Sequence, residues 1–327
     1  ALCGKDGRVQ EIRGEGSLLS RRSAALFEAL REAGAELEAA SNEDGWPVRV
    51  RSAARAPRLK IRNPASSQEV SALWIALAAW PGESTLEIEG VVPSRSYLEL
   101  TRRVLSVFGA RVEGSQVHGP MKAPVKPFVV EPDASSAAVF LAAGCLSGGR
   151  VEIEGLGEGS AQPDARAADL LARFGCRTKT GASSVVAEGM PTRGVEADLS
   201  DSPDLAPVLA AVAAAAARNS GSTSRLTGLA TLPGKESSRI EVLARGLCAC
   251  GFVARAGPDF LEIGPGPGHE RGSEVVLDPA GDHRMAFAFA LLGLVVDGVR
   301  LVDPGCVAKS WPGFWDDLAK CGAELLR

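Results

Sequence analysis

The hydrophobic pattern of the chain predicts helices of two kinds. Helices of the first kind are almost wholly apolar and rich in small residues, so little of their surface would face water. They are expected at residues 71–80, 134–146, 205–217 and 285–296. Helices of the second kind are amphipathic and open with basic or hydroxyl residues. They are expected at residues 18–30, 97–108, 164–174, 235–249 and 314–321.

Short strands are predicted between these helices. A Gly-containing turn and then a strand follow each apolar helix, at residues 84–89, 150–154, 222–226 and 299–302. A strand is also expected at residues 8–13, and further strands follow the amphipathic helices. The alternation of helices and strands predicts an α/β fold in which sheets cover a helical core.

A glycine at the end of each amphipathic helix marks an internal repeat. The glycines are Gly34, Gly109, Gly175, Gly251 and Gly322, and a leucine lies four residues before each of them. Glycine at this place is the usual left-handed cap of a helix. Its recurrence about every 70 residues indicates that one supersecondary unit is repeated along the chain.

Counting these repeats predicts two domains. Three complete repeats follow residue 130, which gives a C-terminal three-repeat domain at residues 131–327. Residues 1–130 are expected to form an incomplete N-terminal repeat domain. Residues 1–3 are typical of the tail of a buried helix, so we expect the start of the first repeat to lie upstream.

The composition argues against nucleic acid as a partner. The chain has 327 residues, 45% hydrophobic and 23% charged, as is typical of a soluble globular protein. A net charge of −4 and a single tyrosine give no general reason to expect nucleic acid. Any anion site must therefore come from local clusters of basic residues.

Cysteine and histidine usage predicts no metal site built from protein side chains. The seven cysteines are odd in number and form no Cys-x-x-Cys, which predicts reduced, packed thiols in a cytoplasmic protein. The three histidines lack ligand spacing. The longest apolar stretches are too short to span a bilayer, so we expect no membrane partner.

The start of the last apolar helix carries an unusual charged pair. Asp282 is expected to cap the helix, and His283 and Arg284 follow it directly. Helix N-termini attract anions, and an arginine there adds a bidentate fork. The alternative, which the residues leave open, is that Arg284 bridges to a nearby carboxylate.

Equivalent loops in successive repeats hold further polar clusters. Their basic members are Arg21, Lys235, Arg239, Arg284 and Lys309, and the acids near them are Asp204, Glu236 and Asp282. Taken singly, each signal has a simpler interpretation as a helix cap or a solvated helix start. Stacked repeats would bring these loops to one side and form a pocket for a multiply anionic ligand.

The combination of motifs resembles the enolpyruvyl transferase family, and within it the 5-enolpyruvylshikimate-3-phosphate synthases. The motifs occur in the family's order over essentially the whole chain. They are Ser66-Ser67-Gln68, Ser94-Arg95-Ser96-Tyr97, Asp133-Ala134-Ser135-Ser136-Ala137, Asp201-Ser202-Pro203-Asp204, Lys235-Glu236-Ser237-Ser238-Arg239, Asp282-His283-Arg284-Met285-Ala286 and Ala308-Lys309.

This resemblance implies a two-domain enolpyruvyl-transferase fold of the inverse α/β barrel type, with three repeats in each domain and the site in the cleft. It implies transfer of the enolpyruvyl group of phosphoenolpyruvate to the 5-hydroxyl of shikimate 3-phosphate, with phosphate release. This is a step of the shikimate pathway of aromatic amino acid biosynthesis. Two small-molecule substrates and no cofactor, metal, nucleic acid or membrane are implied.

The resemblance also implies roles for individual residues. The shikimate 3-phosphate contacts would be Ser66, Ser67, Gln68, Ser94, Asp204 and Lys235, and the phosphoenolpyruvate clamp would be Arg21, Arg239, Arg284 and Lys309. Asp204 is the candidate base, and Glu236 and Lys235 would handle the proton of the vinyl carbon.

Three departures from the family pattern keep two other functions open. The family's N-terminal phosphate-binding segment is absent, so we expect it on a separate chain or outside this sequence. Arg22 stands where the family usually has proline, and Ser238 where it usually has aspartate. The alternatives are a non-catalytic remnant that only binds ligands and an enolpyruvyl transferase acting on a UDP-sugar.

Overall fold

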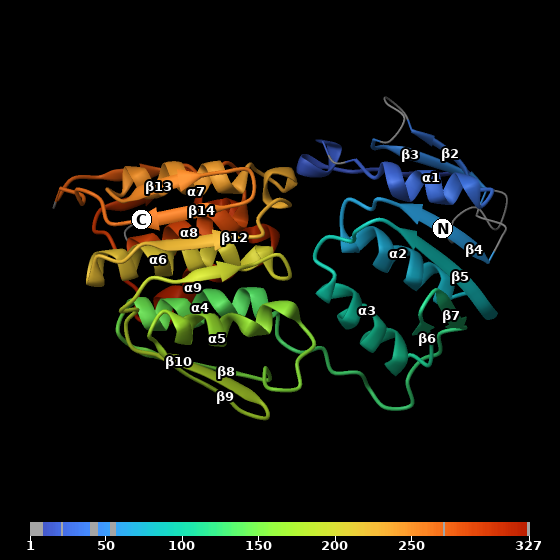
Figure 1. Cartoon of the computed structure of the whole chain (residues 1–327), viewed down its shortest axis with the longest axis horizontal. Helices are drawn as coiled ribbons and strands as arrows, with labels where there is room; N and C mark the ends of the chain where they lie inside the picture. Colours follow the sequence, from blue (N-terminus) through green and yellow to red (C-terminus); the bar gives the residue numbers. More distant parts are fainter. Residues whose placement is uncertain (1–8, 21, 40–44, 53–56, 271, 326–327) are drawn as a thin grey trace. The chain divides into compact units, whose positions relative to one another are not determined.

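The computed structural model describes residues 9–20, 22–39, 45–52, 57–270 and 272–325 (Figure 1). The chain divides into two compact units, Ala1–Val129 and Val130–Arg327. Both are mixed α/β structures in which helices alternate with short strands, as the hydrophobic pattern predicts.

The first unit packs helices against two sheets. Its helices are α1 (Ala24–Glu32), α2 (Ser67–Ala78) and α3 (Ser96–Val107), with a short 3-10 turn η1 (Gly16–Ser20). One sheet has the order β1-β3-β2 and the other β4-β5-β7-β6. The strands are β1 (Gln10–Ile12), β2 (Glu36–Ala39), β3 (Val48–Ser52), β4 (Arg58–Arg62), β5 (Gly82–Glu89), β6 (Arg111–Glu113) and β7 (Gln116–Gly119).

The second unit follows the same scheme on a larger scale. Its helices are α4 (Ala134–Leu146), α5 (Ala167–Arg173), α6 (Ala206–Ser220), α7 (Arg239–Ala249), α8 (His283–Gly293) and α9 (Phe314–Lys320). Its strands are β8 (Arg150–Glu154), β9 (Arg177–Thr180), β10 (Ser184–Glu188), β11 (Glu196–Asp198), β12 (Ser224–Thr227), β13 (Val253–Ala256), β14 (Leu261–Gly264), β15 (Val275–Leu277) and β16 (Val299–Leu301). They form sheets of order β8-β10-β9, β11-β12-β14-β13 and β15-β16.

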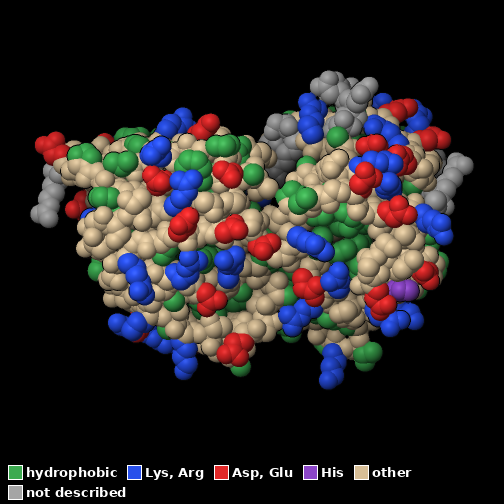
Figure 2. Space-filling view, in the orientation of Figure 1, with side chains coloured by type: hydrophobic (Ala, Val, Ile, Leu, Met, Phe, Trp, Pro, Cys, Tyr) green, Lys and Arg blue, Asp and Glu red, His purple; other side chains and the backbone are tan. Residues whose placement is uncertain are grey.

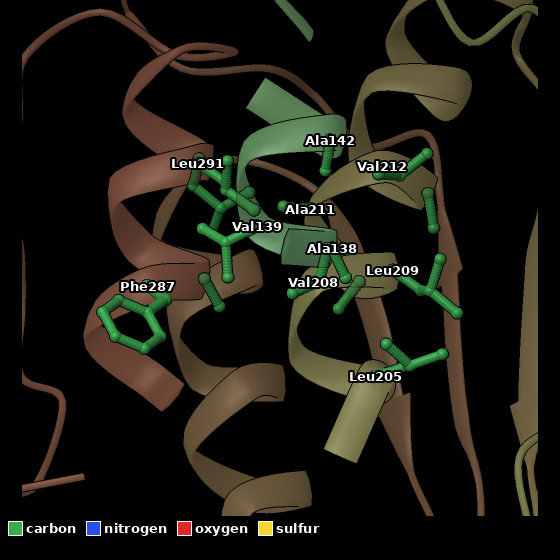
Figure 3. Close-up of a cluster of buried hydrophobic side chains, with 14 of the residues drawn as sticks. Ala138, Val139, Ala142, Leu205, Val208, Leu209, Ala211, Val212, Phe287 and Leu291 are labelled. Carbon is green, nitrogen blue, oxygen red and sulfur yellow. The ribbon is translucent and has the colours of Figure 1, made fainter. Parts of the chain in front are cut away.

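The core of the second unit lies between α4, α6 and α8 (Figure 3). Val139 of α4, Val208 and Leu209 of α6 and Leu291 of α8 are all at most 5% exposed. Between them lie alanines such as Ala211, whose small side chains let the helix backbones approach closely. The prediction that these three segments are buried helices is confirmed.

All five repeat glycines adopt the left-handed conformation that the repeat predicts, with φ between 77° and 99°. In each case the N–H of the next residue donates to the carbonyl of the leucine four positions before the glycine, at 3.0–3.2 Å. The N–H of the glycine itself donates to the carbonyl of the residue three positions before it, at 2.9–3.0 Å. These bonds form a Schellman cap, which satisfies carbonyls that a helix end would otherwise leave without partners.

Several predicted amphipathic helices begin later than the pattern indicates. The segment 18–30 splits into η1 and α1, and 164–174 splits into the 3-10 turn η2 (Pro163–Arg166) and α5. The helix expected from residue 235 begins at Arg239, because the 3-10 turn η4 (Leu232–Gly234) precedes it and Lys235 is extended. These splits matter, since they place charged side chains in turns instead of on a helix flank.

Two absences concern the described residues alone. Every helix among them is too short or too polar to traverse a lipid bilayer. They also contain no group of three histidine, cysteine or acidic side chains able to hold a metal ion. The six cysteines that the structure describes are free thiols.

Candidate active site

The second unit gathers charged residues where several helices begin. Two further 3-10 turns contribute, η3 (Pro203–Leu205) before α6 and η5 (Pro304–Lys309) before α9. The cluster, hereafter the charge cluster, consists of Asp204 in η3, Lys235 and Glu236 after η4, Arg239 at the start of α7, Asp282 and Arg284 at the start of α8, and Lys309 at the end of η5. All of these residues except Asp282 are site residues that the sequence predicts.

Arg239 is the centre of the charge cluster. Its side chain is 2% exposed, and its guanidinium donates from Nη1 to Asp204 Oδ1 at 2.9 Å. Nη2 donates to Glu236 Oε2 at 2.8 Å, and Nε donates to Asp282 Oδ2 at 2.7 Å. A further bond runs from Nη2 to Asp282 Oδ1 at 3.2 Å, so four of the five N–H donors of the guanidinium are in use. One guanidinium thus joins three carboxylates.

Asp204 lies among three cations. Besides Arg239, Arg284 Nη2 lies 3.3 Å from Asp204 Oδ2 and Lys235 Nζ lies 3.5 Å from Oδ1. Burial raises the pKa of Asp204, but the charges of Arg284, Lys235 and Arg239 together lower it further, to about 2. The carboxylate is therefore ionised at neutral pH, the state that a proton acceptor needs.

Glu236 is held in the same way from two sides. Lys309 Nζ donates to Glu236 Oε1 at 2.5 Å, and Arg239 contacts Oε2. Burial raises the pKa of Glu236, while the hydrogen bond from Lys309 and the charge of Arg239 lower it to about 2. Glu236 is thus a second ionised acid in the cluster.

His283, the first residue of α8, lies beside the charge cluster and is uncharged. Its side chain is 9% exposed, and Nδ1 lies 3.8 Å from Asp282 Oδ1, beyond hydrogen-bond distance. Nδ1 has no hydrogen-bond partner among the described residues. Burial and the charge of Arg284 lower the pKa of His283, so the imidazole is neutral at neutral pH.

The start of α8 shows the helix cap and the carboxylate contact that the sequence analysis considered, and the anion-binding role of Arg284 stays a prediction. Asp282 does cap the helix, accepting from the Arg284 N–H at 3.0 Å. The Arg284 side chain bridges to a carboxylate, that of Asp204. Ser238, which departs from the family pattern, is the N-cap residue of α7. Serine and aspartate are both favoured at this position, but the Ser238 side chain makes no capping hydrogen bond.

The remaining predicted site residues belong to the first unit or lie outside the described residues. Ser66 precedes α2 in extended conformation and its side chain makes no capping bond, which removes the simple cap interpretation for this hydroxyl. Ser67 is 4% exposed and opens the helix. Ser94 precedes α3, and Gln68 lies in the first turn of α2. Arg21 lies outside the described residues.

Left-handed backbone recurs in the loops next to these positions. The described non-glycine residues with positive φ are Asn63 (47°), Ser94 (52°) and Ala280 (54°). Asn63 lies three residues before Ser66, and Ala280 lies two residues before Asp282. Strained conformations of this kind cost about 1–3 kcal/mol each and concentrate at functional sites.

The contacts that anchor Asp282 were not predicted from the sequence. Ser237 Oγ donates to Asp282 Oδ2 at 3.1 Å, in addition to the two bonds from Arg239. The sequence does indicate that Asp282 needs a charge partner, because a carboxylate at the start of an almost wholly apolar helix will be buried and needs a cation beside it. Its partner could not be identified, since Arg239 lies 43 residues away in sequence.

Charged side chains of both signs lie on the face shown in Figure 2. Figure 2 shows basic and acidic side chains interspersed over the visible face of each unit, without a broad basic patch.

The family model described as "EPSP synthase (3-phosphoshikimate 1-carboxyvinyltransferase)" matches residues 1–318 of the chain. The chain belongs to the EPSP synthase family. The predicted resemblance is confirmed, and its α/β fold class with it. The EPSP synthase of Acinetobacter baumannii has the same fold, with a TM-score of 0.73, 24% identity and coverage of 97% of this chain and 74% of that one.

Sequence relatives of the EPSP synthase family support the same assignment. A 3-phosphoshikimate 1-carboxyvinyltransferase of Methanoculleus marisnigri is 38% identical over 314 residues, which are 94% of this chain and 72% of the relative. One from Erwinia tasmaniensis is 30% identical over 329 residues, 98% of this chain and 74% of the relative. These comparisons give no support to the expected separate chain carrying an upstream segment.

The fold is also shared outside the EPSP synthases. The enolpyruvyl transferase NikO from Streptomyces tendae matches with a TM-score of 0.70 and 22% identity, over 99% of this chain and 74% of that one. At this identity the match concerns the fold alone.

Proposed function

We propose that this chain transfers the enolpyruvyl group of phosphoenolpyruvate to the 5-hydroxyl of shikimate 3-phosphate and releases phosphate. The match to the EPSP synthase family over residues 1–318 is the observation that carries the proposal. The charge cluster supplies the chemistry that such a transfer needs: ionised acids for proton transfer and cations for anionic substrates.

Asp204 is the proposed base for the 5-hydroxyl. When the hydroxyl oxygen bonds to C2 of phosphoenolpyruvate, its proton must leave, and the Asp204 carboxylate is ionised and able to accept it. A carboxylate with a pKa of about 2 is a weak base. Substrate anions that draw Arg284 and Lys235 toward themselves would raise the pKa of Asp204 and make it a stronger one.

Lys235 and Glu236 are the proposed groups for the proton at the vinyl carbon. Addition converts the methylene carbon to a methyl group, so one proton must be delivered there. Elimination of phosphate then removes a proton from the same carbon and restores the double bond. Lys235 is adjacent to Asp204, and Glu236 is held by Lys309 and Arg239, so both lie within the charge cluster.

Arg21, Arg239, Arg284 and Lys309 are the proposed cations for phosphoenolpyruvate. Arg239 retains one N–H of Nη1 without a partner among the described residues, so it can give a ligand at most one bond without releasing an acid. Arg284 and Lys309 are 20% and 49% exposed and hold single acids, which leaves them freer to turn toward an anion. The developing charge of the intermediate would be offset by these cations.

Shikimate 3-phosphate is proposed to contact Ser66, Ser67, Gln68, Ser94, Asp204 and Lys235. The Ser66 hydroxyl is unused as a cap and lies at the start of α2, where backbone N–H groups favour an anion.

A three-repeat second domain is part of the proposal, supported by its three Schellman caps. A cytoplasmic location is also part of the proposal. It is supported by the free thiols of the six cysteines that the structure describes.

A substrate swap tests the proposal against its alternatives. The chain is incubated with phosphoenolpyruvate and either shikimate 3-phosphate or a UDP-sugar, and the products are identified by mass. We expect an enolpyruvyl product when shikimate 3-phosphate is the acceptor and no product when the UDP-sugar is the acceptor. A product from the UDP-sugar would establish the other transferase activity, and tight binding of both ligands without product would establish a non-catalytic protein.

A further inference from the structure

We infer that Asp282 is a positioning residue for Asp204: it fixes Arg239 and Arg284 so that each contacts one oxygen of the proposed base. The inference rests on the proposed function for its kinetic test. No contact between Asp282 and Asp204 is involved, so the effect must pass through the two arginines.

The first path runs through the Arg239 side chain. Asp282 accepts from Nε at 2.7 Å and from Nη2 at 3.2 Å, which engages one edge of the planar guanidinium with both carboxylate oxygens. A two-point contact fixes the orientation of the plane as well as its position. The opposite nitrogen, Nη1, is thereby directed at Asp204 Oδ1, 2.9 Å away.

The second path runs through the backbone of Arg284. Asp282 Oδ1 accepts from the Arg284 N–H at 3.0 Å and so defines where α8 begins. The preceding turn has left-handed backbone at Ala280 and Gly281, with φ of 54° and 68°. With the helix start fixed, the Arg284 side chain reaches Asp204 Oδ2 at 3.3 Å.

The two paths end on different oxygens of the same carboxylate. Arg239 contacts Oδ1 and Arg284 contacts Oδ2, so the plane of the Asp204 carboxylate is held from both ends. A base whose lone pairs are held in one direction loses less entropy when it meets the hydroxyl. Asp282 itself is 0% exposed and is also held by Ser237, so the anchor is rigid.

The substitution Asp282→Asn separates positioning from helix capping. Asparagine has nearly the same shape and keeps a side-chain oxygen for the Arg284 N–H, since it is as good a cap as aspartate. It loses the charge and the second acceptor on which the Arg239 contact depends. Asp278→Asn is the matched control, because Asp278 caps its own turn through Ala280 N in the same loop and its side chain is exposed.

The kinetic test compares these variants with Asp204→Asn and with the double variant. We expect Asp282→Asn to lower kcat by about 10- to 100-fold with less than a threefold change in KM for shikimate 3-phosphate. Because Asp282 acts through Asp204, we expect little further loss when Asp282→Asn is added to Asp204→Asn. A kcat within twofold of the wild type, or a loss that multiplies fully in the double variant, would overturn the inference.

A second readout needs no substrate and so separates this inference from the proposed function. Hydrogen exchange of the Arg239 Nε–H, followed by NMR, should be slow in the wild type and in Asp278→Asn, and fast in Asp282→Asn. Slow exchange in Asp282→Asn would contradict the anchoring role even in a protein without turnover. If Asp282→Asn does not fold, Ser237→Ala removes a single bond to the anchor: we expect faster Nε–H exchange, and unchanged exchange would count against the inference.

Discussion

Arg239 Nη1 donates to Asp204 Oδ1 at 2.9 Å and joins two helix starts that lie 35 residues apart in sequence. The contact keeps the proposed base ionised and oriented before any substrate is bound. It also makes the base dependent on the charges around it, because Arg239, Arg284 and Lys235 all lower the pKa of Asp204.

Removing the charge of Asp204 should abolish most of the activity and leave the fold intact. We expect Asp204→Asn to lower kcat by about 10²- to 10⁴-fold, the range typical of a lost general base. Asp201→Asn is the control, since Asp201 lies three residues upstream and is exposed. Steady-state kinetics with both substrates measure the effect. A kcat for Asp204→Asn equal to that of the control would remove Asp204 from the mechanism.

Acid should weaken the second unit through Asp204 and Glu236. Their pKa values in the folded chain, about 2, are below the ordinary values of 3.8 for aspartate and 4.5 for glutamate. The stabilisation is therefore fully present above about pH 4.5 and is lost as the pH falls toward 2. For Asp204 it amounts to on the order of 2 kcal/mol.

Urea unfolding of the wild type and Glu236→Gln between pH 2 and pH 6 measures this dependence. We expect the wild type to lose more stability than the variant as the pH falls from about 5 to 2, because the variant lacks one of the two ionised acids. Parallel curves for the two proteins over this range would show that Glu236 does not carry the depressed pKa.

The repeat glycines should differ in what they tolerate. An added Cβ at Gly322 meets nothing within 4 Å, whereas at Gly251 it would lie 2.3 Å from the Gly268 backbone. Both have left-handed φ, 99° and 83°. Gly322→Ala should therefore cost only the conformational strain, about 1–2 kcal/mol. Gly251→Ala should destabilise the protein more than Gly322→Ala, since backbone atoms must move to make room for the methyl group. Thermal unfolding of both variants measures the difference. Equal losses would show that the close approach at Gly251 is not a constraint.

Local pattern was enough to predict most of the fold. Apolar runs predicted α4, α6 and α8, and the Leu-to-Gly spacing predicted five helix caps, because both depend on residues a few positions apart. The late start of α7 was not predicted. Residues 235–239 have helical spacing, but Lys235 is extended and the helix begins at Arg239, where the side chain can reach Asp282 and Asp204.

The site was predicted as a set of residues and not as an arrangement. Lys235, Glu236, Arg239 and Lys309 were identified as cations and acids of one pocket, and the structure brings them together with Asp204. Which of these residues pair with one another could not be predicted, because the Arg239–Asp282 contact spans 43 residues and the Lys309–Glu236 contact spans 73. Charge patterns in sequence indicate that a buried acid needs a partner, but not which one.

The most direct test of the account is phosphate release by this chain from phosphoenolpyruvate. The reaction is followed with phosphoenolpyruvate alone, with shikimate 3-phosphate alone and with both, and Asp204→Asn is run in parallel. We expect phosphate only when both substrates are present, and at least 100-fold slower release by the variant, as for loss of a general base. Equal release by wild type and variant, or none from the wild type with both substrates, would contradict the account.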